Sequence, residues 1–142
     1  KLIIIGEGEE KNNLNHKIRE NNMEKDIFIL GYKSNVFQYL HKSLFFLLSS
    51  SWEDPGFVLV EAAASNKLIL SSNVLSGPKE FLYNKSSGFL FEKENIRDFK
   101  NKVKYILSNI NSKEIFINKV NAKKNSKNYT LFFHFKELIK LL

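Results

Sequence analysis

Two carboxylates separated by seven residues are the part of this sequence best suited to chemistry. Glu53 follows an apolar run, and Glu61 lies within a helical pattern of valine, leucine and alanine. A helix that is apolar nearly all round is typical of a buried helix, where an unpaired carboxylate costs on the order of several kcal/mol. Glu61 therefore either forms a salt bridge, for example with a lysine, or points into a cleft and accepts hydrogen bonds from ligand hydroxyls. The spacing allows both carboxylates to face one cleft at different depths.

The start of the same helical pattern offers backbone N–H donors. Asp54 is a good N-cap residue and Pro55 suits the first helical position, so we expect this helix to span residues 55–65. Its first turn then holds Gly56 and Phe57, whose open N–H groups can bind an anion such as a diphosphate. The alternative is that the Asp54 side chain alone satisfies these donors.

Short apolar runs alternate with helical patterns along the chain. The predicted strands cover residues 2–5, 27–30, 44–48, 68–71 and 88–91, and the predicted helices cover 9–21, 35–41, 55–65, 78–83, 96–110, 113–125 and 131–142. Strict alternation of this kind predicts βαβ units, hence an α/β fold with a three-layer, Rossmann-like parallel sheet and helices on both faces. Ligands of such sheets bind beyond the carboxyl ends of the strands. We therefore expect the site in the loops that follow the strands.

Composition narrows the function classes. The chain has 142 residues, 43% hydrophobic and 13% aromatic, which excludes disorder and fits one domain. There is no cysteine, as suits a reducing cytoplasm, and the three histidines lie on separate predicted helices without metal-ligand spacing. The net charge of +7 reflects either lysine-rich solvated faces or attraction to phosphates or an anionic membrane surface. The basic residues are scattered and not interleaved with aromatics, so we expect no nucleic acid partner.

The segment from residue 53 to residue 64 resembles the Glu-x7-Glu motif of retaining family 4 glycosyltransferases, which have the GT-B architecture of two Rossmann-like domains. The family pattern is close to Glu-Gly-Phe-Gly-Leu-Val-Leu-Leu-Glu-Ala-Met-Ala, and the matches in register are Glu53, Gly56, Val58, Leu59, Glu61, Ala62 and Ala64. Residues 2–8, 29–32, 76–80 and 88–90 resemble further family segments, so the resemblance covers about residues 1–110. Asn66 replaces the usual glycine after the helix, and asparagine tolerates the left-handed conformation required there.

The resemblance implies a role for each matching residue. Glu61 would hold the ribose hydroxyls, and Glu53, the implied catalytic residue, would contact the donor sugar near its reacting carbon. The other implied donor-binding residues supply backbone N–H groups to the diphosphate (Gly56, Phe57, Val58), border the base (Gly31, Tyr32, Lys33) or let the backbone pass near the ligand (Gly6, Gly8). Lys33 is either a phosphate-neutralising cation or a solvated lysine. No metal and no cofactor is implied, because cations and a helix N-terminus carry the charge of the leaving group.

The resemblance also implies what the chain is part of. Residues 1–142 would be a single donor-binding domain, the C-terminal half of a GT-B enzyme, without the first strand of this domain and without the N-terminal acceptor domain. We expect a hexosyltransferase-type enzyme that moves a sugar from a nucleotide-diphosphate sugar to an acceptor hydroxyl with retention, in cell-surface polysaccharide or lipopolysaccharide synthesis. The fragment by itself should be inactive.

The remaining expectations concern location and rival functions. The expected location is cytoplasmic, with peripheral contact to the inner face of the membrane as one interpretation of the basic charge and of the apolar final helix. That helix would otherwise be exposed or drive dimerisation. The alternative functions are a GT-B sugar-nucleotide epimerase and a non-catalytic flavodoxin-like binding module.

Overall fold

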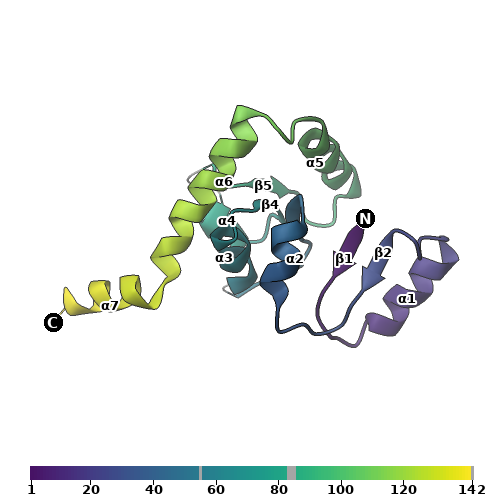
Figure 1. The fold of residues 1–142 in the computed structure, drawn as a ribbon, viewed down its shortest axis with the longest axis horizontal. Coiled ribbons are helices and arrows are strands. Elements are labelled where there is room, and N and C mark those ends of the chain that lie inside the picture. The colour runs from purple at the N-terminus through teal and green to yellow at the C-terminus, as the bar shows by residue number, and fades with distance from the viewer. Residues whose placement is uncertain (55, 83–85, 142) are drawn as a thin grey trace. The chain divides into compact units, whose positions relative to one another are not determined.

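Parallel strands organise the computed structural model, which describes residues 1–54, 56–82 and 86–141 (Figure 1). Strand β1 (Leu2–Ile4) pairs in parallel with β2 (Ile27–Ile29). A second sheet has the order β3 (Phe45–Leu48), β4 (Leu68–Ser72) and β5 (Phe89–Phe91), again with parallel pairs. The predicted parallel α/β fold is confirmed, and each strand lies within one or two residues of its predicted range.

Helices separate the strands, as the alternating pattern predicts. They are α1 (Lys11–Glu20), α2 (Val36–Lys42), α3 (Phe57–Ala64), α4 (Pro78–Leu82), α5 (Ile96–Ser108), α6 (Lys113–Ser126), the 3₁₀ turn η2 (Lys127–Tyr129) and α7 (Leu131–Ile139). None of the helices in the described residues combines the length and the apolar character needed to cross a lipid bilayer.

The internal contacts divide the chain into two units. The N-terminal unit is Lys1–Tyr39 and the C-terminal unit is Leu40–Leu142, so the boundary falls inside α2. The N-terminal unit contains β1, α1 and β2, and the C-terminal unit contains the three-stranded sheet with the helices that follow it. The assignment of residues 1–142 to one domain stays a prediction.

Strand β4 is the centre of the C-terminal unit, because all five of its residues are buried. Side chains alternate between the faces of a strand, so its apolar residues supply both sides of the core. Ile69 packs in a cluster with Leu59 of α3, whereas Leu68 packs in a separate cluster with Ile106 of α5. Helices therefore cover both faces of this sheet, as predicted.

Helix α6 connects the two clusters. Its early residue Ile115 belongs to the cluster on the α5 side, and Ala122, two turns later, belongs to the cluster that contains α3. Asn125 donates a hydrogen bond from its side chain to the carbonyl of Phe81 in α4, at 2.8 Å. Because small residues such as alanine permit close helix contact, α6 can pack directly on α3.

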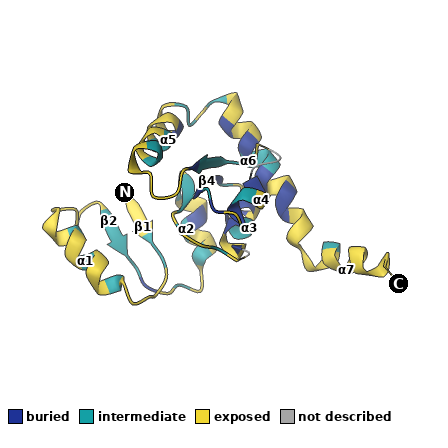
Figure 2. Ribbon diagram, turned by 180° about the vertical axis from the view of Figure 1, so that it is seen from behind, coloured by how far each residue is buried: buried dark blue, intermediate teal, exposed yellow. Residues whose placement is uncertain are grey.

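The last helix, α7, lies away from the sheet of its own unit (Figure 2). Thr130 caps its first turn, since the Thr130 hydroxyl accepts a hydrogen bond from the backbone N–H of Phe133. Leu131 is 89% exposed and Phe132 is 79% exposed. The apolar helix is exposed in the chain as described, and its roles in dimerisation and at a membrane surface stay predictions.

We predict that Gly88→Ala destabilises the C-terminal unit. A Cβ at Gly88 would lie 2.7 Å from the carbonyl oxygen of Ile69 and 3.0 Å from the side chain of Leu82. The extra methyl group overlaps backbone of the central strand, so the free energy of unfolding should fall by about 1–3 kcal/mol. Urea unfolding followed by circular dichroism measures the change.

The matched control is Gly8→Ala, because no atom lies within 4 Å of a Cβ placed there. Its effect should stay within about 0.5 kcal/mol, as for an ordinary surface substitution. Equal stability of Gly88→Ala and the unmodified protein would contradict the packing described around β4.

Candidate functional site

A chain of hydrogen bonds holds Glu53 at the carboxyl end of the C-terminal sheet. The Ser50 hydroxyl, two residues after the end of β3, donates to Oε1 of Glu53 at 2.5 Å. The hydroxyl of Ser72, the last residue of β4, donates to the backbone carbonyl of Ser50, also at 2.5 Å. Glu53 is half-buried. The loop that carries this carboxylate is therefore tied to two neighbouring strands at the edge where parallel sheets bind ligands.

Gly56 adopts a left-handed conformation next to the same carboxylate. Its φ is +74°, and a Cβ there would lie 3.4 Å from Oε2 of Glu53. Residues with a side chain adopt this conformation at a cost of about 1–2 kcal/mol. Glycine at this position thus allows both the turn into α3 and the close approach of the Glu53 carboxylate to the backbone.

The predicted start of the helix is wrong. We expected a helix over residues 55–65 with Asp54 as its N-cap, but α3 begins at Phe57 and its N-cap is Gly56, with no side-chain hydrogen bond. A residue with φ of +74° cannot continue a right-handed helix, which moves the first turn past Gly56. Asp54 is exposed, and Pro55 lies outside the described residues.

The first turn of α3 presents two backbone donors that have no partner among the residues the structure describes. Within the described residues, no group accepts a hydrogen bond from the N–H of Phe57 or of Val58. The later helices differ, because Asn95, Ser112 and Thr130 cap α5, α6 and α7 through their side chains. The positive end of the α3 dipole is therefore open to an anion.

Glu61 lies one turn into α3, on its exposed face. Phe57 is 61% exposed and Val58 is 40% exposed, while Glu61 is partly buried. The expectation that this helix is buried nearly all round is wrong, because only the opposite face, with Leu59 and Ala62, packs against the core. In the part of the chain that the structure describes, Glu61 joins no ion pair and accepts no side-chain hydrogen bond, so the salt bridge with a lysine is not formed.

The end of α3 follows the expected pattern. Asn66 has a φ of +58°, the left-handed conformation anticipated for asparagine in place of glycine. Its N–H bonds to the carbonyl of Ala63 at 2.9 Å, and the N–H of Lys67 bonds to the carbonyl of Ala62 at 3.0 Å. These two bonds form a Schellman motif that closes the helix.

Three of the predicted site residues in the N-terminal unit, Gly6, Gly31 and Tyr32, lie close together. The N–H of Gly6, after β1, bonds to the carbonyl of Gly31, after β2, at 3.0 Å. Gly31 is buried with a φ of +70°, and the Glu7 carboxylate lies directly against its Cα. The same carboxylate accepts a hydrogen bond from the N–H of Tyr32 at 3.3 Å and pairs with Lys11 at 3.1 Å. Sequence analysis missed Glu7, although its position between two glycines after a strand is a signal.

Gly8 and Lys33 take no part in these contacts. The Gly8 carbonyl accepts a hydrogen bond from the N–H of Lys11 at 3.2 Å, which opens α1. Lys33 is partly exposed. The predicted site residues thus form one group in each unit, Gly6, Gly31 and Tyr32 in the first and Glu53, Gly56, Phe57, Val58 and Glu61 in the second. Their roles toward a ligand stay predictions.

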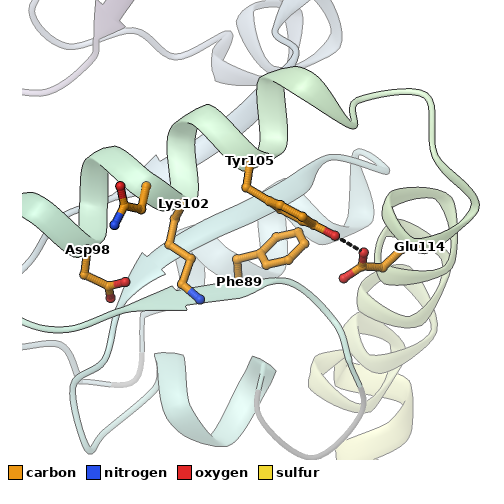
Figure 3. A pocket seen from close by; sticks show the side chains of 6 residues that line it. Phe89, Asp98, Lys102, Tyr105 and Glu114 are labelled. Atoms are coloured by element: carbon orange, nitrogen blue, oxygen red, sulfur yellow. Dashed lines mark hydrogen bonds between the residues drawn. The ribbon is translucent and has the colours of Figure 1, made fainter.

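A hollow of about 440 Å³ beside α5 is a second place where polar side chains gather (Figure 3). The Tyr105 hydroxyl donates to the Glu114 carboxylate, and this bond raises the pKa of Tyr105. The Tyr105 ring meets Phe89 edge-on, with the ring centres 5.7 Å apart. Asp98 accepts a hydrogen bond from the N–H of Glu92 at 2.8 Å. The first of these bonds joins α5 to α6 and the second joins α5 to the chain after β5, so we assign a structural role to the polar groups of this hollow.

Another hollow, of about 330 Å³, lies near the carboxyl ends of the strands, and Phe91, Asn95 and Phe99 are among its lining residues. As the described residues define them, neither of these two hollows is lined by Glu53 or Glu61. Ser51 and Ser72 also line the second hollow, so it borders the loop that carries Glu53.

Comparison with known proteins shows consistent similarity to one family. Residues 1–125 match the family described as glycosyl transferases group 1. Over 123 residues the chain is 29% identical to the N-acetylgalactosamine-N,N'-diacetylbacillosaminyl-diphospho-undecaprenol 4-alpha-N-acetylgalactosaminyltransferase of Campylobacter jejuni, which is 87% of this chain and 34% of that protein. The chain spans about a fifth to a third of the length of the curated relatives it matches.

Solved structures share the fold. A Staphylococcus aureus TarM mutant in complex with fondaparinux, alpha-GlcNAc-glycerol and UDP is 24% identical with a TM-score of 0.86, over 99% of this chain and 28% of that one. HepE of Anabaena in complex with UDP-glucose is 19% identical with a TM-score of 0.81, over 99% of this chain and 40% of that one. The predicted GT-B-type, Rossmann-like fold is confirmed.

We predict that Glu7 titrates below the ordinary glutamate value. The hydrogen bond from Lys11, followed by that from the Tyr32 N–H, lowers the pKa of Glu7. Because the folded pKa is depressed, the stabilising contact is present above the ordinary pKa and is lost as the pH falls through the lowered one. The side-chain carboxyl carbon, followed by NMR during an acid titration, gives the midpoint.

Lys11→Ala should move this midpoint back toward the ordinary value, whereas Lys17→Ala on the same helix should not change it. A midpoint that Lys11→Ala leaves unchanged would show that the contact does not exist in solution.

Proposed function

Because the chain belongs to the glycosyl transferases group 1, we propose that it forms the donor-binding part of a glycosyltransferase. The reaction moves a sugar from a nucleotide-diphosphate sugar to an acceptor hydroxyl with retention of the anomeric configuration. The observation that carries the proposal is the cluster at the start of α3. There the Glu53 carboxylate, the left-handed Gly56 and two backbone N–H groups without a partner among the described residues lie within six residues of chain.

The unpartnered donors suit the diphosphate. A diphosphate that accepts hydrogen bonds from the N–H groups of Phe57 and Val58 lies on the positive end of the helix dipole. When the bond to the sugar breaks, negative charge develops on this diphosphate, and fixed donors that already point at it lower the barrier. This accounts for the leaving group without a metal ion or a cofactor, and we propose that neither takes part.

The two carboxylates suit the two ends of the donor. Glu53 precedes the diphosphate-binding turn, and Glu61 follows Phe57 by four residues, which is about 6 Å along the helix axis. A nucleotide sugar has the same order, with the sugar, the diphosphate and the ribose in sequence. This order agrees with the roles that the family resemblance implies, the hydroxyls of the donor sugar for Glu53 and those of the ribose for Glu61.

The N-terminal unit enters the proposal through the family resemblance. Its strand-end loops, in which Gly6 bonds to Gly31 and the ring of Tyr32 is 75% exposed, would border the base of the nucleotide. We keep the roles that the resemblance implies for the other two residues. Gly8 would let the backbone pass near the ligand, and Lys33 would border the base.

The relatives support a biological context. The Campylobacter jejuni relative is by name a transferase that acts on a diphospho-undecaprenol-linked saccharide. The similar solved structures of TarM and HepE are complexes with UDP and with UDP-glucose, respectively. We propose a uridine diphosphate sugar as the donor, a cell-surface polysaccharide or lipopolysaccharide as the product, and a cytoplasmic location at the inner face of the membrane.

We predict that Glu61→Ala removes the ribose-dependent part of nucleotide affinity. The affinities of UDP, GDP and ADP and of their glucose conjugates are measured by calorimetry on the full-length natural protein. A hydrogen bond between a carboxylate and a hydroxyl contributes about 1.5–3 kcal/mol, so Glu61→Ala should weaken the binding of the preferred nucleotide about tenfold or more. The variant and the unmodified protein should bind 2′,3′-dideoxyuridine diphosphate equally.

The matched control is Glu20→Ala, which removes an exposed carboxylate at the end of α1 and should leave affinity unchanged. Undiminished UDP affinity in Glu61→Ala would refute the assignment of Glu61. An epimerase, the rival enzyme, would return an altered nucleotide sugar without any acceptor, and product analysis by NMR separates the two reactions. A non-catalytic binding module would give neither product.

A further inference from the structure

We propose, on the basis of the function above, that Ser50 and Ser72 are positioning residues for Glu53. They hold its carboxylate in the orientation in which it meets the donor sugar. The inference rests on two consecutive hydrogen bonds, from the Ser72 hydroxyl to the Ser50 carbonyl and from the Ser50 hydroxyl to Glu53 Oε1. Both serines act through Glu53, and neither is assigned a contact with the donor.

The Ser72 hydroxyl fixes the backbone of the loop. Ser72 is 1% exposed, at the end of a strand whose preceding residues Leu68, Ile69 and Leu70 are fully buried. A buried hydroxyl costs free energy unless it is hydrogen-bonded, so strand packing alone favours alanine or valine here. The bond to the Ser50 carbonyl satisfies this hydroxyl and places the loop after β3 against the end of β4.

The Ser50 hydroxyl then fixes the side chain of Glu53. A free glutamate side chain loses on the order of 1.5–2 kcal/mol of rotamer entropy when it is held in one orientation. Hydrogen bonds from hydroxyls to carboxylates are short and strong, and the 2.5 Å bond between Ser50 and Glu53 is of this kind. This ordering is complete before the donor arrives, so donor binding does not have to supply it.

The same bond leaves the second oxygen of Glu53 available. Oε1 is engaged by Ser50, whereas Oε2 lies over Gly56, where it has no hydrogen-bond partner among the described residues. A carboxylate offers about four lone-pair sites, so Oε2 can accept from a sugar hydroxyl while Oε1 stays bound. The glycine and the serine therefore determine together which oxygen faces the donor.

The first test compares the sugar-dependent part of binding in Ser50→Ala, Ser50→Thr and the unmodified full-length protein. The measured quantity is the ratio of the dissociation constant of UDP to that of UDP-glucose. Ser50→Ala should lower this ratio about tenfold, because a misplaced carboxylate loses its contact with the sugar, while the affinity for UDP itself stays the same. Ser50→Thr keeps the hydroxyl and should restore the ratio.

The second test shows whether Ser50 acts through Glu53. The rate of UDP-glucose hydrolysis without acceptor is measured for Ser50→Ala, Glu53→Ala and the double variant. Each single variant should lower kcat/KM about tenfold to hundredfold, through a higher KM that follows the weaker binding of UDP-glucose and through a lower kcat. The double variant should be no worse than Glu53→Ala, since residues that act as a unit are not additive.

Matched controls exclude a general loss of folding. Ser51→Ala removes an exposed hydroxyl next to Ser50. Ser71→Ala removes a fully buried hydroxyl next to Ser72, which among the described residues bonds to the Ser72 carbonyl, at 3.3 Å. Both should keep the sugar-dependent affinity, whereas Ser72→Ala should lower it. Thermal unfolding of every variant reports its stability.

The outcomes separate this inference from the proposed function. Suppose that the unmodified protein binds UDP-glucose. The positioning role is then refuted, and the proposed function stands, in either of two cases: the effects of Ser50→Ala and Glu53→Ala on kcat/KM add, or Ser50→Ala lowers the affinities for UDP and UDP-glucose equally. If the unmodified protein binds none of the nucleotide sugars, both are refuted.

Discussion

The left-handed conformation of Gly56 is the constraint on which the candidate site depends. With a φ of +74° the chain cannot enter a helix at this residue, so α3 begins one residue later and its N-terminus lacks a side-chain cap. The absence of a Cβ lets the Glu53 carboxylate lie against the backbone at the same point. One backbone angle thus exposes the donors that suit a diphosphate and makes room for the carboxylate that suits a sugar.

The second requirement is a rigid edge for this turn, and β4 provides it. The strand is buried on both faces, with Ile69 in the cluster of α3 and Leu68 in the cluster of α5. It ends in a buried serine whose hydroxyl reaches the loop after β3. Apolar burial therefore fixes the strand, and a single polar contact at its end transfers that rigidity to Glu53. A site on a loop gains precision when its backbone is bonded to a buried element in this way.

The fold was predictable because it depends on local patterns, and the same patterns suggested the candidate site. Alternating apolar runs and helical periods predicted the strands and helices, and Asn66 was expected to end α3 in the left-handed conformation that it adopts. The start of α3 was predicted wrongly because Asp54 and Pro55 are both favourable at a helix start, whereas the backbone angle of Gly56 is decided by the loop. The bond between Ser50 and Ser72 joins residues 22 positions apart, and no spacing rule reveals such a contact.

The candidate site of the C-terminal unit occupies a short segment of the chain, and this suits a family whose sequences differ widely. The three recognition tasks of the proposed function, for the sugar, the diphosphate and the ribose, fall to residues between Glu53 and Glu61. Their order along the donor follows from the turn at Gly56 and the first turn of α3, and the bond from Ser72 of β4 to the Ser50 carbonyl fixes the loop that carries Glu53. Most of the remaining chain can change as long as β3, β4 and α3 keep their places. The chain shares its fold with two solved structures at TM-scores of 0.81 and 0.86, although its sequence is only 19% and 24% identical to theirs. A fold that tolerates many substitutions outside the site is consistent with such low identities.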